Sequence, residues 1–199
     1  MGHRDYIGGL WDEIGQLQFD FLLSNGLKPF NFLLDIACGS LRLGVKAIPY
    51  LDNGHYFGID KEIGLIKAGL EKELNSTIIK KKQPRFVISD SFEFKKFGNK
   101  VDFVIAQSLF THLPNHLINL CFINLYPWLK DDGIFWATFF ETKKKICNPK
   151  KSHDHDFFAY TKNEMIEFGE SNGYITRYIG DWNHPRKQMI VEYKKAINL

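Results

Sequence analysis

Hydrophobic residues recur with two different periods along the chain. Spacing of three to four residues predicts helices, and short continuous apolar runs predict buried strands. The helical pattern covers residues 10–23, 41–50, 63–74, 117–129 and 162–171. The strand pattern covers residues 32–36, 56–59, 85–88, 101–106 and 133–140. Strands and helices therefore alternate, which favours right-handed crossovers and a mainly parallel sheet.

The C-terminal part of the chain changes this rhythm. Residues 175–179 and 189–193 predict two strands, and the connection between them has no room for a helix. Because a parallel pair needs a dozen or more connecting residues, these two strands must pair antiparallel. The pattern predicts an α/β fold with a seven-stranded, mostly parallel sheet that ends in a C-terminal antiparallel strand pair.

Acidic residues follow the first three predicted strands. Asp35 ends the first, Asp60 follows the second and Asp90 follows the third. In open parallel sheets ligands bind beyond the carboxyl ends of the strands, so these acids are expected at one edge. Gly39 lets the backbone approach a ligand closely. A nucleoside fits this set, because carboxylates accept charge-assisted hydrogen bonds: Asp60 from the ribose hydroxyls and Asp90 from an adenine amino group.

At this point the sequence resembles the class I S-adenosylmethionine-dependent methyltransferases. The resemblance rests on residues 34–40, 57–60, 89–92, 101–108 and 129–133. It implies a Rossmann-like three-layer sandwich that binds S-adenosylmethionine and releases S-adenosylhomocysteine. The cofactor-binding residues that it implies are Asp35, Ala37, Gly39, Ser40, Asp60, Lys61, Asp90, Ser91, Phe92 and Gln107.

The turn after the first strand departs from that family's pattern. The family has Gly-x-Gly-x-Gly there, whereas this chain has Ala37, Gly39 and Leu41. Leu41 could belong to a variant turn in which Arg42 pairs with a carboxylate. A side chain that blocked the turn would favour another function, that of a non-catalytic binding or scaffold protein with the same fold.

Two other nucleotide-binding classes fit the sequence poorly. A nicotinamide dehydrogenase needs G-x-G-x-x-G after the first strand, and residues 37–42 do not supply it. Tyr126 and Lys130 have the Tyr-x-x-x-Lys spacing of short-chain dehydrogenases, but Pro127 follows the tyrosine directly. A P-loop motif is absent from the sequence.

Candidate catalytic and acceptor-binding residues come from three segments. His112 follows the fourth strand and belongs to the residue type that serves most often as a general base. The connection between the last two strands adds His184, which is the second candidate catalytic residue. Candidate substrate-binding residues are Trp11, Trp182 and Arg186. Each also has a purely structural interpretation, as a turn cap, a solvated turn or a packed helix start.

We expect one methyltransferase domain over residues 1–199. Residues 1–29 are predicted to form a helical segment that covers the cofactor site, and residues 141–160 a lid. The lid's lysines, together with Arg186, indicate an anionic acceptor. His153 to Asp156 alternate His and Asp, but a polar loop of this kind is usually solvated, so no metal is expected.

Composition narrows the function further. A net charge of only +3 argues against a dedicated nucleic-acid binder. Three cysteines without paired spacing fit a reducing, cytoplasmic compartment. No apolar run approaches the roughly 18 residues of a membrane span, so no membrane partner is expected. The N-terminus also lacks the apolar core of a signal peptide.

We therefore predict an enzyme that methylates oxygen or nitrogen of a small-molecule acceptor, such as a metabolite or glycan precursor. It would act as a monomer or homodimer. Two alternatives stay open: the non-catalytic scaffold, and an RNA methyltransferase whose RNA specificity is supplied by a partner.

Overall fold

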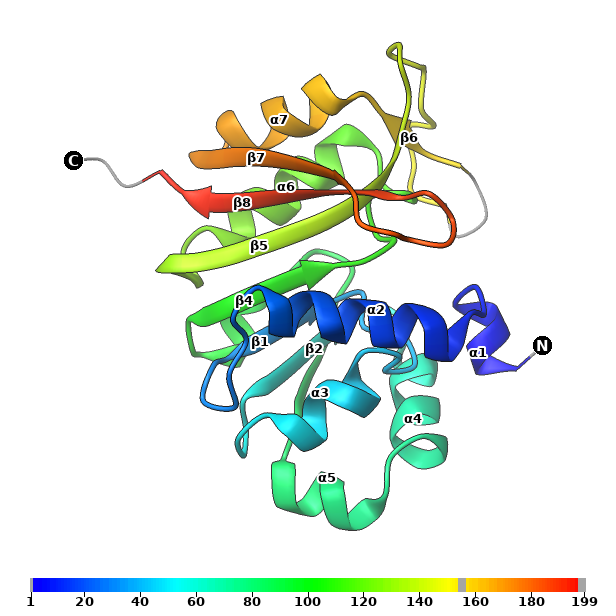
Figure 1. Ribbon diagram of the computed structural model, residues 1–199, viewed down its shortest axis with the longest axis vertical. Coiled ribbons are helices and arrows are strands. Elements are labelled where there is room, and N and C mark those ends of the chain that lie inside the picture. The colour runs from blue at the N-terminus through cyan, green and yellow to red at the C-terminus, as the bar shows by residue number, and fades with distance from the viewer. Residues whose placement is uncertain (1, 154–156, 197–199) are drawn as a thin grey trace. The chain divides into compact units, whose positions relative to one another are not determined.

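The computed structural model describes residues 2–153 and 157–196. The chain divides into two compact units, residues 1–90 and 91–199. Each unit combines strands with helices that lie between them in the sequence (Figure 1). The predicted α/β class and mostly parallel pairing are therefore confirmed.

The first unit is built on three parallel strands. Its elements are α1 (His3–Tyr6), α2 (Trp11–Ser24), β1 (Leu33–Ile36), α3 (Gly44–Tyr50), β2 (Tyr56–Asp60), α4 (Ile63–Lys72), α5 (Ser76–Lys82) and β3 (Arg85–Ile88). Strand β2 lies between β1 and β3, and Gly58 pairs with Asp35 on one side and Phe86 on the other. All four residues of β1 are buried, as expected for a parallel strand covered on both faces.

The second unit mixes parallel and antiparallel pairing. Its elements are η1 (Phe94–Phe97), β4 (Val101–Ala106), α6 (Asn115–Leu125), β5 (Leu129–Glu141), β6 (Ala159–Tyr160), α7 (Lys162–Glu170), β7 (Tyr174–Asp181) and β8 (Met189–Lys195). Strands β4, β6 and β5 run parallel, while β8 lies antiparallel to both β5 and β7. The predicted C-terminal antiparallel pair is confirmed.

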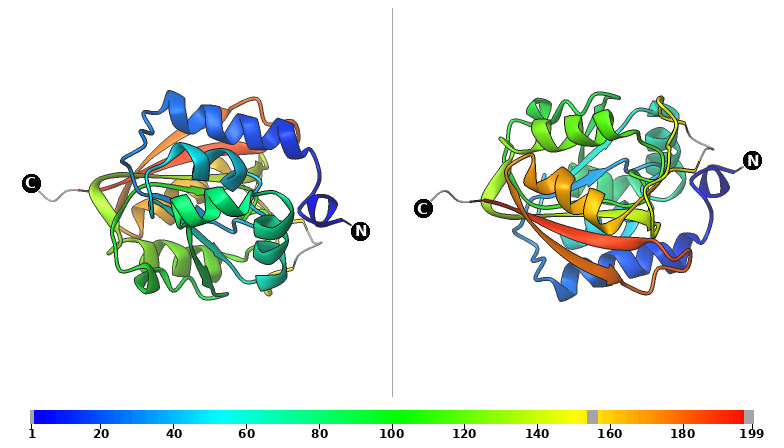
Figure 2. Two further views of the ribbon diagram at one scale, coloured as in Figure 1. Left: turned by 90° about the horizontal axis from the view of Figure 1, so that it is seen from below. Right: turned by 90° about the horizontal axis from the view of Figure 1, so that it is seen from above.

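Helices α6 and α7 cover the same face of the second unit's sheet (Figure 2). The ring of Phe122 on α6 lies 4.7 Å from that of Tyr193 on β8. Gly169 on α7 meets the same tyrosine, because a Cβ at that position would lie 2.6 Å from its ring. These contacts bury the aromatic face of β7 and β8 under two helices.

Several element boundaries differ from the prediction for identifiable reasons. Helix α6 ends at Leu125, ahead of Pro127, which cannot donate a helical hydrogen bond. Helix α3 begins at Gly44 because Leu41 has a left-handed φ of 68°. Strand β6 brings the strands of the described residues to eight, one more than predicted. Helix α5 was also not predicted, whereas α1 lies within residues 1–29, which were predicted to be helical. In the described parts of the chain, no helix is long and apolar enough to cross a membrane.

Candidate functional site

The turn after β1 keeps a left-handed backbone at all three positions where the methyltransferase pattern has glycine. The φ angles are 59° at Ala37, 53° at Gly39 and 68° at Leu41. A residue with a Cβ is strained in this region by about 1–2 kcal/mol. The fold therefore imposes the glycine-type turn although only one of the three residues is glycine.

The side chain of Leu41 does not block this turn. It is completely buried, and it packs against α4 at Gly69, where an added Cβ would lie 2.7 Å from Leu41 Cγ. The same Cβ would lie 2.4 Å from the carbonyl oxygen of Ser40. Helix α4 thus reaches the turn through a glycine, and that missing side chain makes room for Leu41 in the core.

Asp60 joins the end of β2 to this turn. Its Oδ2 accepts the backbone N–H of Gly39 at 2.8 Å, and its Oδ1 accepts that of Glu62 at 2.9 Å. Helix α4 begins at Ile63 with Glu62 as its N-cap, so Asp60 does not cap it. Burial raises the pKa of Asp60, and the two backbone N–H groups act in the opposite direction. Because each carboxylate oxygen has two lone pairs, both can still accept a hydroxyl.

Asp35 lies deeper than Asp60. Only 3% of its surface is exposed, and its Oδ2 accepts the hydroxyl of Tyr56 at 2.7 Å. Burial raises the pKa of Asp35 to about 7, against the lowering effect of the Tyr56 hydrogen bond. This predicted site residue therefore lies in the core, where the Tyr56 hydroxyl joins it to β2. Tyr56 has no motif around it and was not predicted.

Residues 2–10, here called the N-terminal strap, lie against the turn. Arg42 Nη1 donates to the carbonyl oxygen of Gly9 at 3.0 Å. Ile7 lies beside Gly39, where an added Cβ would come within 3.2 Å of Ile7 Cγ2. Glu73, just after α4, pairs with both His3 and Arg4. The strap thus covers the one glycine that the turn retains, and Trp11 follows it as a buried residue of α2.

A polar cluster lies in the second unit where β4, β5 and the β7–β8 connection meet. The backbone N–H of Ser108 donates to Thr138 Oγ1 at 2.8 Å, and that hydroxyl donates to Gln188 Oε1 at 2.7 Å. Gln188 Nε2 donates a hydrogen bond to Ser108 Oγ at 2.8 Å. Gln107 and His184 complete the cluster, 3.1 Å apart through their Nε2 atoms. Of the five, only Gln107 and His184 were predicted, because long-range hydrogen bonds leave no local pattern.

His184 is completely buried in this cluster. Its Nδ1 accepts the backbone N–H of Arg186 at 3.2 Å. Its Nε2 lies 3.1 Å from the amide nitrogen of Gln107, so both ring nitrogens face N–H groups. The ring also stacks on Trp182, with centroids 5.5 Å apart. Trp182 is itself buried, and Arg186 is exposed.

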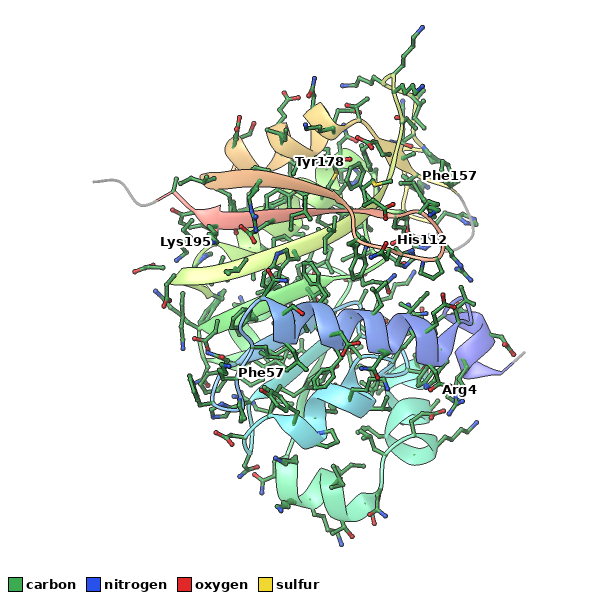
Figure 3. All side chains as sticks on the ribbon, in the orientation of Figure 1. Arg4, Phe57, His112, Phe157, Tyr178 and Lys195 are labelled. Atoms are coloured by element: carbon green, nitrogen blue, oxygen red, sulfur yellow. The ribbon has the colours of Figure 1, made fainter. Side chains whose placement is uncertain are left out.

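The ring of His112 faces a carbonyl group, unlike that of His184. Its Nδ1 lies 3.2 Å from the carbonyl oxygen of His153. Because a carbonyl only accepts, the Nδ1 atom of a neutral ring must carry the proton, and Nε2 is the basic nitrogen. The backbone N–H of His153 also donates to the His112 carbonyl at 3.3 Å. His112 is half-buried and comes from the loop between β4 and α6 (Figure 3).

The remaining predicted residues have varied surroundings. Asp90 and Lys61 are exposed in the first unit. Ser91 is exposed, and Phe92 is buried with its ring 6.0 Å from that of Phe94. In the described chain, no group of three or more His, Cys, Asp or Glu side chains is placed to hold a metal ion. Residues 154–156 of the alternating His and Asp run lie outside the described residues.

The fold is that of the class I S-adenosylmethionine-dependent methyltransferases. Magnesium protoporphyrin IX methyltransferase from Synechocystis PCC 6803, solved with bound S-adenosylmethionine, matches with a TM-score of 0.68 at 18% identity, over 92% of this chain and 80% of that chain. A glycopeptide N-methyltransferase solved with S-adenosylhomocysteine matches with a TM-score of 0.68 at 12% identity, over 92% and 90%.

An S-adenosylmethionine-dependent methyltransferase from Clostridium acetobutylicum ATCC 824 matches with a TM-score of 0.62 at 12% identity, over 92% of this chain and 90% of that chain. No protein-family model matches the sequence. Because these identities are below 20%, the similarity establishes the fold and leaves the chemistry to the residues of this chain.

Proposed function

We propose that this protein binds S-adenosylmethionine and transfers its methyl group to a small-molecule acceptor. The observation that supports this proposal most directly is the position of the Asp60 carboxylate. It accepts the backbone N–H groups of Gly39 and Glu62 and retains lone pairs for the two ribose hydroxyls. The left-handed turn beside it supports the same proposal, because its backbone at Gly39 is held next to Asp60. S-adenosylmethionine supplies a methyl group that is activated on a sulfonium sulfur.

The residues of the first unit hold the cofactor in this proposal. Asp60 accepts the ribose hydroxyls, while Gly39 and Ser40 present backbone to the methionine part. Asp35 joins β1 to β2 through the Tyr56 hydroxyl. Lys61, Ala37 and Asp90 complete the set.

The residues of the second unit serve the acceptor. His112 accepts a proton from an acceptor hydroxyl or amine at Nε2, since the His153 carbonyl holds the other proton at Nδ1. His184 is assigned to positioning Gln107, since it is completely buried with its Nε2 beside that amide. Trp182 supports the His184 ring, while the exposed Arg186 is proposed to contact the acceptor.

The acceptor's class and the compartment are inferred from charge and thiol chemistry. Exposed lysines near β6 and Arg186 favour an anionic metabolite. Cys38, Cys121 and Cys147 are all free thiols, which fits a reducing cytoplasm. The open turn at Leu41 favours an enzyme over a scaffold that has lost its cofactor site.

The test is calorimetric titration of the full chain with S-adenosylmethionine, S-adenosylhomocysteine and NAD as control. Binding of the two sulfur nucleosides alone, with micromolar dissociation constants, is the expected result. Absence of binding in a sample that unfolds cooperatively would contradict the proposal and favour the scaffold function. Tighter binding of NAD would indicate a dehydrogenase instead.

A further inference from the structure

The segment between β5 and β6 is strongly basic. Residues 142–153, here called the basic segment, contain five lysines and no acidic residue: Lys143, Lys144, Lys145, Lys150 and Lys151. All five are exposed. The segment projects beyond α7 in Figure 1, and nitrogen-tipped side chains extend from it in Figure 3.

The base of the basic segment is fastened to the sheet. Asn148 donates through Nδ2 to the Ala159 carbonyl at 2.8 Å and accepts the Ala159 N–H through Oδ1 at 3.1 Å. The backbone N–H of Thr142 donates to the Tyr160 carbonyl at 2.9 Å. These bonds extend the β5–β6 pairing, so the lysines project from a structured base.

Two large apolar side chains are exposed beside the lysines. Ile146 is 40% exposed and Phe157 is 59% exposed. Each stands two residues from the Asn148–Ala159 hydrogen bonds, which is a chain reach of about 7 Å. The ring of Phe157 stacks on Phe140 at 4.8 Å, which holds it in place (Figure 3).

We propose that the basic segment docks the protein on the surface of an anionic phospholipid bilayer. Lysines attract anionic headgroups, and exposed aliphatic or aromatic side chains enter the headgroup boundary. Asp154 and Asp156 follow in the sequence and leave the stretch basic overall. The absence of a membrane-spanning pattern led us to expect no membrane partner, but surface docking requires no span.

A bilayer fits this surface better than a nucleic acid does. Proteins that bind single-stranded nucleic acid interleave basic groups with several aromatic rings on which bases stack. Here Phe157 is the single exposed Phe, Tyr or Trp of the described part of 142–160, and Phe140 already stacks on it. Ile146 offers no stacking surface, whereas it suits an acyl chain.

The test is flotation of the full chain with vesicles of phosphatidylcholine alone or with about a third phosphatidylglycerol. Binding to the anionic vesicles only, falling as salt screens the lysines, is expected. The partition coefficient should fall at least about tenfold when four lysines are replaced. Lys145 is kept because it pairs with Glu164. The variant is Lys143→Gln, Lys144→Gln, Lys150→Gln and Lys151→Gln.

A matched control uses another exposed lysine pair, on α5. Lys80→Gln with Lys81→Gln should leave vesicle binding unchanged. Ile146→Ser with Phe157→Ser should weaken the binding that remains at high salt. Equal loss in the α5 control, equal binding to neutral vesicles, or salt-steep binding to a single-stranded RNA oligonucleotide in place of vesicles would each overturn the proposal. None of these readouts requires S-adenosylmethionine, so the result is independent of the proposed methyl transfer.

Discussion

The carboxylate of Asp60 accepts the backbone N–H of Gly39 at 2.8 Å, and this bond fastens the end of β2 to the turn after β1. The two residues are 21 positions apart in the sequence. Parallel pairing of β1 with β2 brings their carboxyl ends to one edge and so makes the contact possible. One side chain therefore shapes the turn and carries the acceptor oxygens of the proposed ribose site.

Replacement of Asp60 should weaken cofactor binding. Asp60→Ala removes hydrogen bonds to a charged acceptor, so the affinity for S-adenosylmethionine should fall by about 1.5–3 kcal/mol. Asp60→Asn keeps one oxygen for Gly39 and should lose less. Calorimetric titration measures both, and Asp52→Ala, an exposed acid of the same unit, serves as control. Unchanged affinity in Asp60→Ala would remove the ribose assignment.

Two glycines of α4 should respond oppositely to alanine. At Gly69 an added Cβ would meet the Ser40 carbonyl oxygen at 2.4 Å, so the turn must shift. We expect Gly69→Ala to destabilise the protein by about 1–3 kcal/mol, the usual cost of overpacking. Gly64 has nothing within 4 Å of such a Cβ, and Gly64→Ala should stabilise by up to about 1 kcal/mol. Urea unfolding of both variants measures the difference.

Glycine at position 37 should relieve strain in the turn. Ala37 has a φ of 59°, which costs an L-residue about 1–2 kcal/mol, while the extra freedom of glycine in the unfolded chain costs about 0.5–1 kcal/mol. Ala37→Gly should therefore raise the free energy of unfolding slightly, by about 0.5–1 kcal/mol. Ala47→Gly inside α3 should lower it by about 1 kcal/mol. Equal losses in both variants would contradict the strain argument.

Alanine substitutions at His112 and His153 should show that His112 acts through its side chain and His153 through its backbone carbonyl. His112→Ala should leave S-adenosylmethionine binding intact and lower kcat by about 10²-fold or more. His153→Ala keeps the carbonyl that His112 Nδ1 contacts, so its kcat should stay near that of the parent chain. If His112→Ala abolishes cofactor binding instead, His112 belongs to the cofactor pocket.

Asp35 should make stability depend on pH. Its pKa is about 7 in the folded chain because it is buried, against about 4 in an unfolded chain. The folded state therefore holds the extra proton, and its stabilising effect is complete below about pH 4 and lost as pH rises to about 7. Asp35→Asn retains an oxygen for the Tyr56 hydroxyl and should flatten this decline. Unfolding free energies of both chains at pH 5 and pH 8, differing by a few kcal/mol in the parent only, would check it.

Local patterns were sufficient for the class of fold and for part of the site. The apolar runs of β1 and β2 and the short connection before β8 imply parallel strands with an antiparallel end, because side-chain burial sets a period along the chain. The acids at positions 35 and 60 could be placed at strand ends for the same reason. The different burial of these two acids could not be predicted, since burial depends on what packs over each strand.

Only the folded arrangement reveals the left-handed turn at Leu41, its packing on Gly69 and the tautomer of His112. The Gln107–His184 contact joins residues 77 positions apart, and the pairing of Arg4 with Glu73 joins residues 69 apart. Such contacts follow from how strands and helices pack, and no periodicity within a segment encodes them. Local periodicity thus sets which segments become strands and helices, while packing between distant segments sets the backbone strain and proton positions on which chemistry depends.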